Sequence, residues 1–399
     1  MKRDFNDIYS GKKVLIWGYG MEGRSTENFL RTHTQPAEIA IYEGDYDEER
    51  FSGYDVVFKS PGIPYLETFP GLTSQTDLFL QVFRDQTVGI TGTKGKSTVS
   101  GMTYEALKAA GKKTVLAGNI GVPCLDMFDA VDDDTIVVFE LSCHQLMNIT
   151  VAPHISLITN LYEEHLDYYG TREKYFDAKR NIYRKQKIDD ILIVGPDAPV
   201  RDMTHGTTIV YIHSSQFKGE MKLLGEHNRL NAAAARTICA ILNANLGKVN
   251  ESLSEFTGLE HRLETAGEFG GHKWYDDSIS TINESVIAAV QAVPDLGTLI
   301  IGGMDRGIDY SPLVSFLNSW PKELNVICAY ETGERIFPEL KGHCTRVPDL
   351  EHAVETASEI TPEGLSVVMS PGAASYTHFK NFAERGDVFK RLVRERYAG

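Results

Sequence analysis

Residues 87–100 constrain the fold of this 399-residue chain more than any other stretch. Alternating Val88 and Ile90 are typical of the end of a buried strand, residues 91–96 of a tight glycine-bearing turn, and residues 96–111 of a helix. A strand that runs through such a turn into a helix is the start of an α/β unit. Such a unit needs a mostly parallel sheet with helices on both faces.

The turn also carries most of a phosphate-binding loop, in the residues Gly92, Thr93, Lys94, Gly95, Lys96, Ser97 and Thr98. It lacks the first glycine of the usual G-x-x-x-x-G-K-[ST] pattern. Glycines let backbone N–H groups crowd round phosphate oxygens, and the helix start adds its positive dipole end. Lys96 would offset β/γ-phosphate charge and the Ser97 hydroxyl would ligate Mg²⁺. The alternative is a glycine-rich turn that binds nothing, which the Gly-Lys-Ser-Thr sequence in this setting disfavours.

A second glycine-rich turn lies near the N-terminus. Residues 13–17 predict a strand, which is followed by Gly18-Tyr19-Gly20-Met-Glu-Gly23 and a helix to about Arg31. Further strands are expected at 39–42 and 56–59, the second followed by Ser60-Pro61-Gly62. This pattern predicts a Rossmann-like unit that ends near residue 86. The fingerprint also suits an NAD-dependent oxidoreductase, which is the first competing function.

The α/β rhythm continues to the C-terminus. Strands are expected at 114–116, 135–140, 155–159, 191–194, 273–275, 298–301, 325–329 and 366–369, and an alanine-rich helix at 232–243. A turn-like stretch around Thr257-Gly258 indicates a boundary. The prediction is an α/β protein of three domains in series: a Rossmann-like domain (1–86), a P-loop ATPase-like parallel-sheet domain (87–258) and a Rossmann-like C-terminal domain (259–399).

Composition excludes several classes. The formal charge of −15 argues against general nucleic-acid binding. The five cysteines are scattered and form no C-x-x-C pair, which favours reduced thiols over a disulfide set or a zinc site. No apolar run approaches the roughly 20 residues of a membrane span, and no signal peptide is visible. We therefore expect a cytoplasmic protein with small-molecule substrates.

Three further residues suit phosphate chemistry. Glu140 ends a predicted strand, where a carboxylate can hold Mg²⁺, although a strand-end acid can equally face solvent. His165 follows the next strand, as a metal ligand or orienting group would, although loop histidines are more often solvated. Lys179 lies on a predicted helix, and periodicity alone allows it to be a surface lysine.

Several motifs together, in this order and spacing, resemble those of the Mur ligases. They are Gly92–Thr98, Gly118-Asn-Ile-Gly121, Glu140-Leu-Ser-x-x-Gln145, His165-Leu-Asp, Lys179, His227-Asn-x-x-Asn231, Gly258-Leu-Glu-His-Arg262, Asp277-Ser278 and the stretch from Ser370 to Gly386. Within that family, the last stretch and the two N-terminal motifs point to the MurD branch, which adds glutamate to UDP-N-acetylmuramoyl-alanine. The resemblance covers essentially the whole chain.

The resemblance implies a role for each matching residue. Lys96, Ser97 and Thr98 would hold the triphosphate, while Ser97, Glu140, His165 and Lys179 would surround Mg²⁺, with Lys179 carbamylated. Around the adenosine and phosphates it places Asn228, Asn231, Arg262 and Asp277. Contacts to the UDP-sugar and its alanine arm are implied for Gly18, Tyr19, Ser60, Pro61, Gly62, Asn119, Ser142 and Gln145. The incoming glutamate would meet Thr281, Arg306, Ser375 and Phe382.

The implied reaction belongs to peptidoglycan synthesis. ATP would phosphorylate the alanine carboxylate of UDP-N-acetylmuramoyl-L-alanine, with Mg²⁺ and Lys96 offsetting the charge repulsion. The glutamate amine would then attack the acyl phosphate, and the same cations would stabilise the tetrahedral oxyanion. Water must be excluded from the acyl phosphate, so a hinged third domain is expected to close over the site. We expect a monomer.

Four departures from the family pattern leave alternatives open. Asp277 is followed by Ser278-Ile279-Ser280-Thr281-Ile282, where Ser-Lys-x-Thr-Asn is usual. Gly44-Asp45 replace a hydroxyl and a cation that usually contact the uridine monophosphate. In addition, Lys94 replaces the usual Asn of the loop, and Arg306 replaces the usual Lys. The Asp-Asp-Ser-Ile pattern resembles a MurD offshoot that adds L-glutamate instead of D-glutamate. A silent nucleotide-binding protein and a ligase for another amino acid are the remaining competitors. The oxidoreductase would leave residues 87–399 without a role.

Overall fold

The computed structural model describes residues 6–118, 122–202, 207–223, 225–281, 283–305, 307 and 309–398. The predicted site residues Asn119 and Arg306 lie outside them. The chain divides into two compact units, Met1–Phe256 and Thr257–Gly399.

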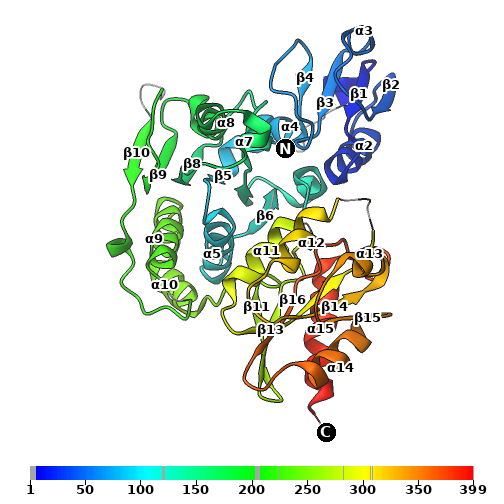
Figure 1. Cartoon of the computed structure of the whole chain (residues 1–399). Coiled ribbons are helices and arrows are strands. Elements are labelled where there is room, and N and C mark those ends of the chain that lie inside the picture. Colours follow the sequence, from blue (N-terminus) through cyan, green and yellow to red (C-terminus); the bar gives the residue numbers. More distant parts are fainter. Residues whose placement is uncertain are drawn as a thin grey trace. The chain divides into compact units, whose positions relative to one another are not determined.

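The first unit begins with a small parallel sheet of strand order β2-β1-β3-β4 (Figure 1). Its elements are α1 (Asn6–Tyr9), β1 (Lys13–Trp17), α2 (Met21–His33), β2 (Glu38–Tyr42), α3 (Glu48–Phe51), β3 (Val56–Lys59), β4 (Leu72–Thr73), α4 (Gln75–Phe83) and η1 (Arg84–Gln86). A Cβ on Gly23 would lie 2.3 Å from the Gly18 carbonyl oxygen, so glycine is required there for α2 to start close to β1.

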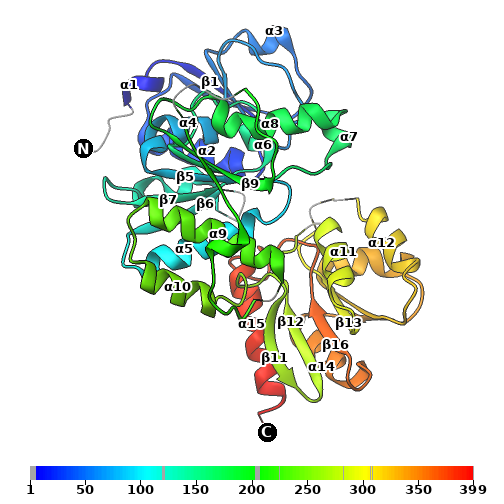
Figure 2. The ribbon, with the colours of Figure 1, turned by 90° about the vertical axis from the view of Figure 1, so that its left-hand side faces the viewer.

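The second sheet of this unit has the order β10-β9-β8-β5-β7-β6, and every neighbouring pair is parallel. Its elements are β5 (Thr87–Thr91), α5 (Lys96–Ala109), β6 (Thr114–Gly118), η2 (Cys124–Ala130), β7 (Ile136–Glu140), α6 (Cys143–Leu146), β8 (Ile155–Asn160), α7 (Leu166–Tyr169), α8 (Arg172–Arg184), β9 (Ile191–Asp197), β10 (Thr208–Tyr211), η3 (Ser214–Gln216), α9 (Glu226–Ile241) and α10 (Leu246–Glu255). Helices α5, α9 and α10 pack together on one face, and α6 and α8 pack on the other (Figure 2).

The two sheets of the first unit share one hydrophobic core. Phe29 of α2 packs edge-to-face on Phe128 at a centroid distance of 4.8 Å, and Phe79 of α4 packs in the same way on Phe139 of β7 at 5.4 Å. All four rings belong to a single cluster of buried residues. The predicted boundary at residue 86 therefore crosses a continuous core, and it stays a prediction.

The second unit holds a third sheet of order β11-β12-β16-β13-β14-β15, parallel except for the antiparallel edge pair β11–β12. Its elements are β11 (Glu264–Phe269), β12 (His272–Asp276), α11 (Asn283–Ala292), β13 (Leu296–Gly302), α12 (Ser311–Asn318), β14 (Asn325–Ala329), α13 (Tyr330–Ile336), η4 (Phe337–Glu339), β15 (Cys344–Val347), α14 (Leu350–Ile360), β16 (Ser366–Met369) and α15 (Phe382–Arg396). Two separate hydrophobic clusters cover its faces, one with α11 and α12 and the other with α14 and α15.

The expected α/β class with parallel sheets is confirmed. The sequence patterns missed four edge strands, β4, β10, β11 and β15, which are short or only partly buried. The helix expected at 232–243 begins six residues earlier, directly after Gly225, whose φ is +111°. In the described part of the chain, no helix is both long and apolar enough to cross a membrane.

Candidate active site

The loop between β5 and α5 has the backbone of a phosphate-binding turn. Gly92 has a φ of +147°, and Gly95, the N-cap of α5, has a φ of +83°. A Cβ on Gly92 would lie 1.8 Å from the Thr159 hydroxyl oxygen, and one on Gly95 would lie 2.8 Å from Asn231 Oδ1. Both glycines are therefore required by backbone conformation and by close neighbours.

The end of β8 holds this loop in place. Asn160 Oδ1 accepts hydrogen bonds from the backbone N–H groups of Thr93 and Lys94, at 3.1 and 2.8 Å. The Thr159 hydroxyl and the Asn160 amide both donate to the Lys94 carbonyl, at 2.8 and 3.0 Å. Sequence reasoning missed Asn160, although a polar residue at the carboxyl end of a strand beside β5 is a detectable signal.

Two lysines converge on a single carbonyl of the loop. Lys179 Nζ donates to the Gly92 oxygen at 2.8 Å, and Lys96 Nζ donates to the same oxygen at 3.0 Å and to the Thr93 oxygen at 3.0 Å. Lys179 is only 1% exposed, so the surface-lysine interpretation is wrong. Burial, and next the Lys96 charge, lower the pKa of Lys179 from 10.5 to about 7.

A buried carboxylate faces these cations. Glu140 ends β7 opposite Ile90 of β5 and is fully buried. Burial lowers the pKa of Lys96, and the charge of Glu140 acts in the opposite direction. Ser97 and Thr98 lie half-buried in the first turn of α5. An oxygen-rich set of this kind beside a glycine loop and a lysine fits a magnesium-bound triphosphate.

His165 occupies a less enclosed position. It has a φ of +55° and an exposed side chain, with Nε2 3.9 Å from a Glu164 carboxylate oxygen. Its ring lies 5.8 Å from that of Tyr175, whose hydroxyl is 3.2 Å from the Thr93 hydroxyl. The structure thus brings His165 toward the loop through Tyr175, but not into the buried cluster of Lys96, Glu140 and Lys179.

The alanine-rich helix α9 contributes two buried amides. Asn231 Nδ2 donates to Asn228 Oδ1 at 3.2 Å, and Asn231 lies against Gly95. These are the two residues expected near the nucleotide. Their positions, three apart on α9, place both amides on the side of the helix that meets the phosphate-binding loop.

The second glycine-rich turn meets the segment after β3. The Ser60 hydroxyl donates to the Gly18 carbonyl at 2.6 Å, and Gly18 has a φ of +90°. The hydroxyl of Tyr168, at the end of α7, donates to the Ile63 oxygen at 2.6 Å, next to the expected Pro61-Gly62 contacts. The Tyr19 hydroxyl bonds to Glu27.

Ser142 and Gln145 form the capping box of α6. Gln145 N donates to the Ser142 hydroxyl at 3.2 Å, and Gln145 Oε1 accepts from Ser142 N at 3.0 Å. The remaining amide nitrogen of Gln145 donates to Glu22 Oε1 at 2.8 Å. Sequence reasoning missed Glu22, because it occupies a variable position of the glycine fingerprint.

In the second unit, Asp277 organises the loop after β12. Its Oδ2 accepts from the Ser280 and Ser370 hydroxyls, both at 2.6 Å, and its Oδ1 accepts from Leu263 N at 3.1 Å. Burial raises the pKa of Asp277 to about 6, and these hydrogen bonds act in the opposite direction. This network brings the Arg262, Asp277 and Ser370 motifs together.

The stretch from Ser370 to Gly386 also contacts the loop after β12. Ser278 Oγ donates to the Phe382 carbonyl at 2.7 Å, and the buried Arg385 donates to the Ser278 and Ala373 carbonyls at 2.8 and 3.0 Å. Ser375 is buried and Thr281 half-buried. Ile279, at the position of a usual lysine, adds no charge to this loop.

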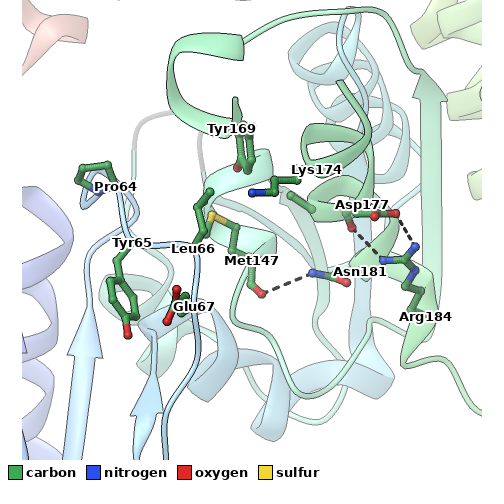
Figure 3. Close-up of a pocket in the computed structure, with 11 residues that line it drawn as sticks. Pro64, Tyr65, Leu66, Glu67, Met147, Tyr169, Lys174, Asp177, Asn181 and Arg184 are labelled. Atoms are coloured by element: carbon green, nitrogen blue, oxygen red, sulfur yellow. Dashed lines mark hydrogen bonds and ion pairs between the residues drawn. The ribbon is translucent and has the colours of Figure 1, made fainter. Parts of the chain in front are cut away.

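A cavity of about 590 Å³ lies on the other side of α8 (Figure 3). It is lined by Pro64, Tyr65, Leu66, Glu67, Met147, Tyr169, Lys174, Asp177, Ala178, Asn181 and Arg184. Asp177 and Arg184 form an ion pair, and Asn181 donates to the Met147 carbonyl. None of the predicted site residues that the structure describes lines this cavity.

Comparisons with known sequences find relatives over most of the chain. The Mur ligase middle domain matches residues 90–208. The UDP-N-acetylmuramoylalanine–D-glutamate ligase of Symbiobacterium thermophilum is 31% identical over 398 residues, which cover 89% of this chain and 87% of that protein. The UDP-N-acetylmuramoyl-L-alanine–L-glutamate ligase of Salinispora tropica is also 31% identical, over 447 residues, and covers 96% of this chain and 98% of its own.

Solved structures share the fold. The UDP-N-acetylmuramate-alanine ligase MurC of Thermotoga maritima gives a TM-score of 0.53 at 18% identity, covering 97% of this chain and 99% of that one. MurF of Acinetobacter baumannii gives 0.54 at 18% identity, covering 79% of each chain. The sequence relatives span nearly the full length and the phosphate-binding loop lies inside the matched middle domain, so the chain belongs to the Mur ligase family.

Proposed function

We propose that this enzyme uses ATP to join D-glutamate to UDP-N-acetylmuramoyl-L-alanine through an acyl phosphate. The names of several relatives, such as the D-glutamate ligases of Symbiobacterium thermophilum and Streptococcus agalactiae, support glutamate as the added amino acid. The single observation that carries the catalytic part is the convergence of Lys96 and Lys179 on the Gly92 carbonyl, with the buried Glu140 carboxylate close enough to act on the charge of Lys96.

Each of these residues has a distinct role in the proposal. Lys96 leaves its loop carbonyls to bind the phosphoryl group that is transferred, and it offsets the charge of the attacking carboxylate. Ser97, Glu140, His165 and Lys179 would hold Mg²⁺, which supplies Lewis-acid stabilisation of the phosphoryl oxygens when bound. Asn228 and Asn231 would serve the adenosine and phosphates, and Asn231 lies against Gly95 of the turn.

Lys179 can act as a metal ligand only after its charge is changed. As an ammonium it donates to Gly92 and cannot coordinate a cation. With a pKa of about 7, a large fraction of the side chain is neutral near neutral pH. The neutral amine attacks CO₂ and loses a proton, which gives a carbamate whose single negative charge is shared by two oxygen donors.

The remaining predicted residues serve the two other substrates. We propose that Gly18, Tyr19, Ser60, Pro61, Gly62, Asn119, Ser142 and Gln145 line the acceptor site, that Arg262 and Asp277 serve ATP, and that Thr281, Arg306, Ser375 and Phe382 serve glutamate. We further propose that the protein acts as a monomer in the cytoplasm, where ATP and nucleotide-linked sugars are supplied. The domain limits 1–86, 87–258 and 259–399 belong to the same proposal.

L-Glutamate is the second candidate for the added amino acid. Two relatives, from Salinispora tropica and a Micromonospora species, are named for L-glutamate and match 96% of this chain at 31% identity. The Asp276-Asp277-Ser278-Ile279 sequence, with an apolar residue where lysine is usual, favours the same alternative.

A phosphate-release assay separates the two candidates. Purified enzyme is given ATP, Mg²⁺, UDP-N-acetylmuramoyl-L-alanine and one glutamate enantiomer at a time, and the nucleotide product is identified by mass. Release with D-glutamate supports the first proposal, and release with L-glutamate alone overturns it in favour of the second. The Lys96→Gln variant is the control for contaminating ATPase, and no release with either enantiomer contradicts the ligase assignment.

A further inference from the structure

We infer that Glu22 is a positioning residue for the acceptor end of the reaction, an inference that rests on the proposed function. It acts through Gln145 and orders the Ser142–Gln145 cap, two residues placed beside the acceptor arm. Neither the glycine fingerprint nor the family motifs assign a role to this carboxylate, which occupies a variable position between Gly20 and Gly23.

The contacts run from α2 to α6 through one side chain. Glu22 Oε1 accepts from Gln145 Nε2 at 2.8 Å, and Gln145 Oε1 accepts from Ser142 N at 3.0 Å. The Ser142 hydroxyl in turn accepts from Gln145 N at 3.2 Å. Both ends of the Gln145 amide are therefore occupied, which makes Gln145 a relay between Glu22 and Ser142.

The surroundings of Glu22 favour a fixed orientation. It lies in the first turn of α2, where the helix dipole stabilises a negative charge. Burial raises its pKa, and the side chains of Gln75 and Gln145 and the charge of Lys59 act in the opposite direction. Lys59 itself is 4% exposed and donates to the Ile63 carbonyl at 2.9 Å, directly beside the Ser60-Pro61-Gly62 segment.

Glu22 therefore lies between the two strand-end segments assigned to the acceptor. One is the Gly18–Ser60 contact at the carboxyl ends of β1 and β3, and the other is the α6 cap after β7. A hydrogen bond to a charged group is stronger and more directional than one between neutral groups. Removing the carboxylate would let Gln145 rotate and would leave Ser142 N without its side-chain partner.

The test measures the acceptor and ATP separately. In Glu22→Ala we expect the KM for UDP-N-acetylmuramoyl-L-alanine to rise about tenfold or more, on the order expected for loss of a charged hydrogen bond. The KM for ATP should stay within about twofold of the native value, because Glu22 does not contact the Gly92 turn. Glu22→Gln keeps an acceptor oxygen for Gln145 Nε2 and should restore most of the acceptor KM.

Glu38→Gln is the matched control, because Glu38 is an exposed carboxylate on β2 whose ion pair with Lys13 spans 3.8 Å. It should behave like the native enzyme. An unchanged acceptor KM in Glu22→Ala overturns the role of Glu22, and so does an equal rise in both KM values, which would indicate a general structural effect. A native enzyme that consumes no ATP with this acceptor overturns the proposed function itself. A native enzyme that turns over, together with a Glu22→Ala variant of unchanged acceptor KM, overturns only the role of Glu22.

Discussion

Lys179 is the residue whose chemistry depends most on its surroundings. Lys179→Ala should reduce ligation to background, because the metal would lose an anionic oxygen donor. Short carboxylic acids such as formate or acetate should restore part of the activity by filling the space of the missing carbamate. The measurement is the rate of phosphate release with and without the added acid.

A neighbouring lysine serves as the control for this rescue. Lys174 lies on the same helix, but it is exposed and lines the cavity on the other side of α8. Lys174→Ala should keep native activity and show no response to carboxylic acids. Full activity of untreated Lys179→Ala would contradict the carbamate role.

The charge of Lys96 also sets the pH range in which Lys179 can react. Lys96 is the second-largest cause of the lowered pKa of Lys179, after burial. In Lys96→Gln that repulsion is gone, so the pKa of Lys179 should rise and its neutral form should appear at higher pH. Carbamate formation, followed by NMR with ¹³C-labelled bicarbonate, should therefore shift its midpoint to higher pH than in the native protein. A shift to lower pH would contradict the proposed coupling.

At the residue scale, the phosphate-binding loop, Glu140 and Lys179 could be predicted because these residues occur along the chain in the order and spacing of the family motifs. The sequence could not predict that Lys179 would be buried, because the helical periodicity in 172–184 does not decide whether Lys179 lies on the buried or the exposed face of the helix. Glu22 and Asn160 were missed because their roles depend on partners 123 and 67 residues away, Gln145 and Thr93.

At the scale of elements, the start of α5 depends on a glycine. Gly95→Ala would place a Cβ 2.8 Å from Asn231 Oδ1 at a φ of +83°. We expect a loss of about 1–2 kcal/mol in the free energy of unfolding from the left-handed backbone and a large rise in the KM for ATP. Denaturant unfolding and steady-state kinetics measure the two effects.

Gly111, after the other end of the same helix, is a matched control. It has a φ of +79°, and a Cβ there would meet no atom within 4 Å. Gly111→Ala should cost a similar free energy of unfolding without changing the KM for ATP. Equal kinetic effects in both variants would show that α5 stability, not the loop contact, controls nucleotide binding.

A buried pair joins the loop before β11 to the end of β12. His261 Nδ1 lies 2.7 Å from Asp276 Oδ2, and both residues are buried. Burial opposes a charge on His261, but the hydrogen bond and charge of Asp276 outweigh it and raise the His261 pKa. Because the folded pKa lies above the unfolded value of about 6.5, this stabilisation is complete below that pH and is lost as pH rises through the folded pKa.

Asp276→Asn should therefore lower the free energy of unfolding by about 2 kcal/mol at acidic pH and by less at alkaline pH. Glu264, Asp387 and Lys390 also face His261 and are present in both proteins, so they largely cancel in the comparison. The measurement is denaturant unfolding of both proteins between about pH 5.5 and 8.5. A difference that grows with pH would contradict the charged pair.

Most elements could be predicted because their strands are central and buried. β5, β7, β8 and β13 read as apolar runs that end in glycine or polar residues, as expected for parallel strands covered on both faces. The four missed edge strands give a weaker signal, because β4 has two residues and no residue of β10 is fully buried. These strands are defined by their pairing with a neighbouring strand, and the local sequence does not show that pairing.

At the scale of the whole molecule, cores and predicted domains divide the chain differently. The two compact units meet at Phe256–Thr257, whereas residues on both sides of the predicted 86–87 boundary share one core. Brief proteolysis of the native protein should therefore cut around 256–258 before any cut near 86–87. Fragments are identified by mass spectrometry.

Calorimetry gives a second measure of the same division. Two compact units with separate cores are expected to produce two overlapping heat-absorption peaks, and ATP with Mg²⁺ should raise the transition temperature of the first unit.

In the proteolysis experiment, early cleavage near residue 86 would show that the shared aromatic core does not hold the first two sheets together.

Lys96 and Lys179 both donate to the Gly92 carbonyl, so either lysine can hold the phosphate-binding loop when the other leaves it. When a phosphate draws Lys96 away from this oxygen, the bond from Lys179 still holds the turn to α8. When Lys179 is chemically modified, Lys96 can keep the turn in place until the nucleotide arrives. Once Lys179 is a carbamate and Lys96 binds a phosphate, neither ammonium group holds the Gly92 oxygen. We therefore expect the hydrogen bonds from the Thr93 and Lys94 N–H groups to Asn160 Oδ1 to keep the loop in place at that stage.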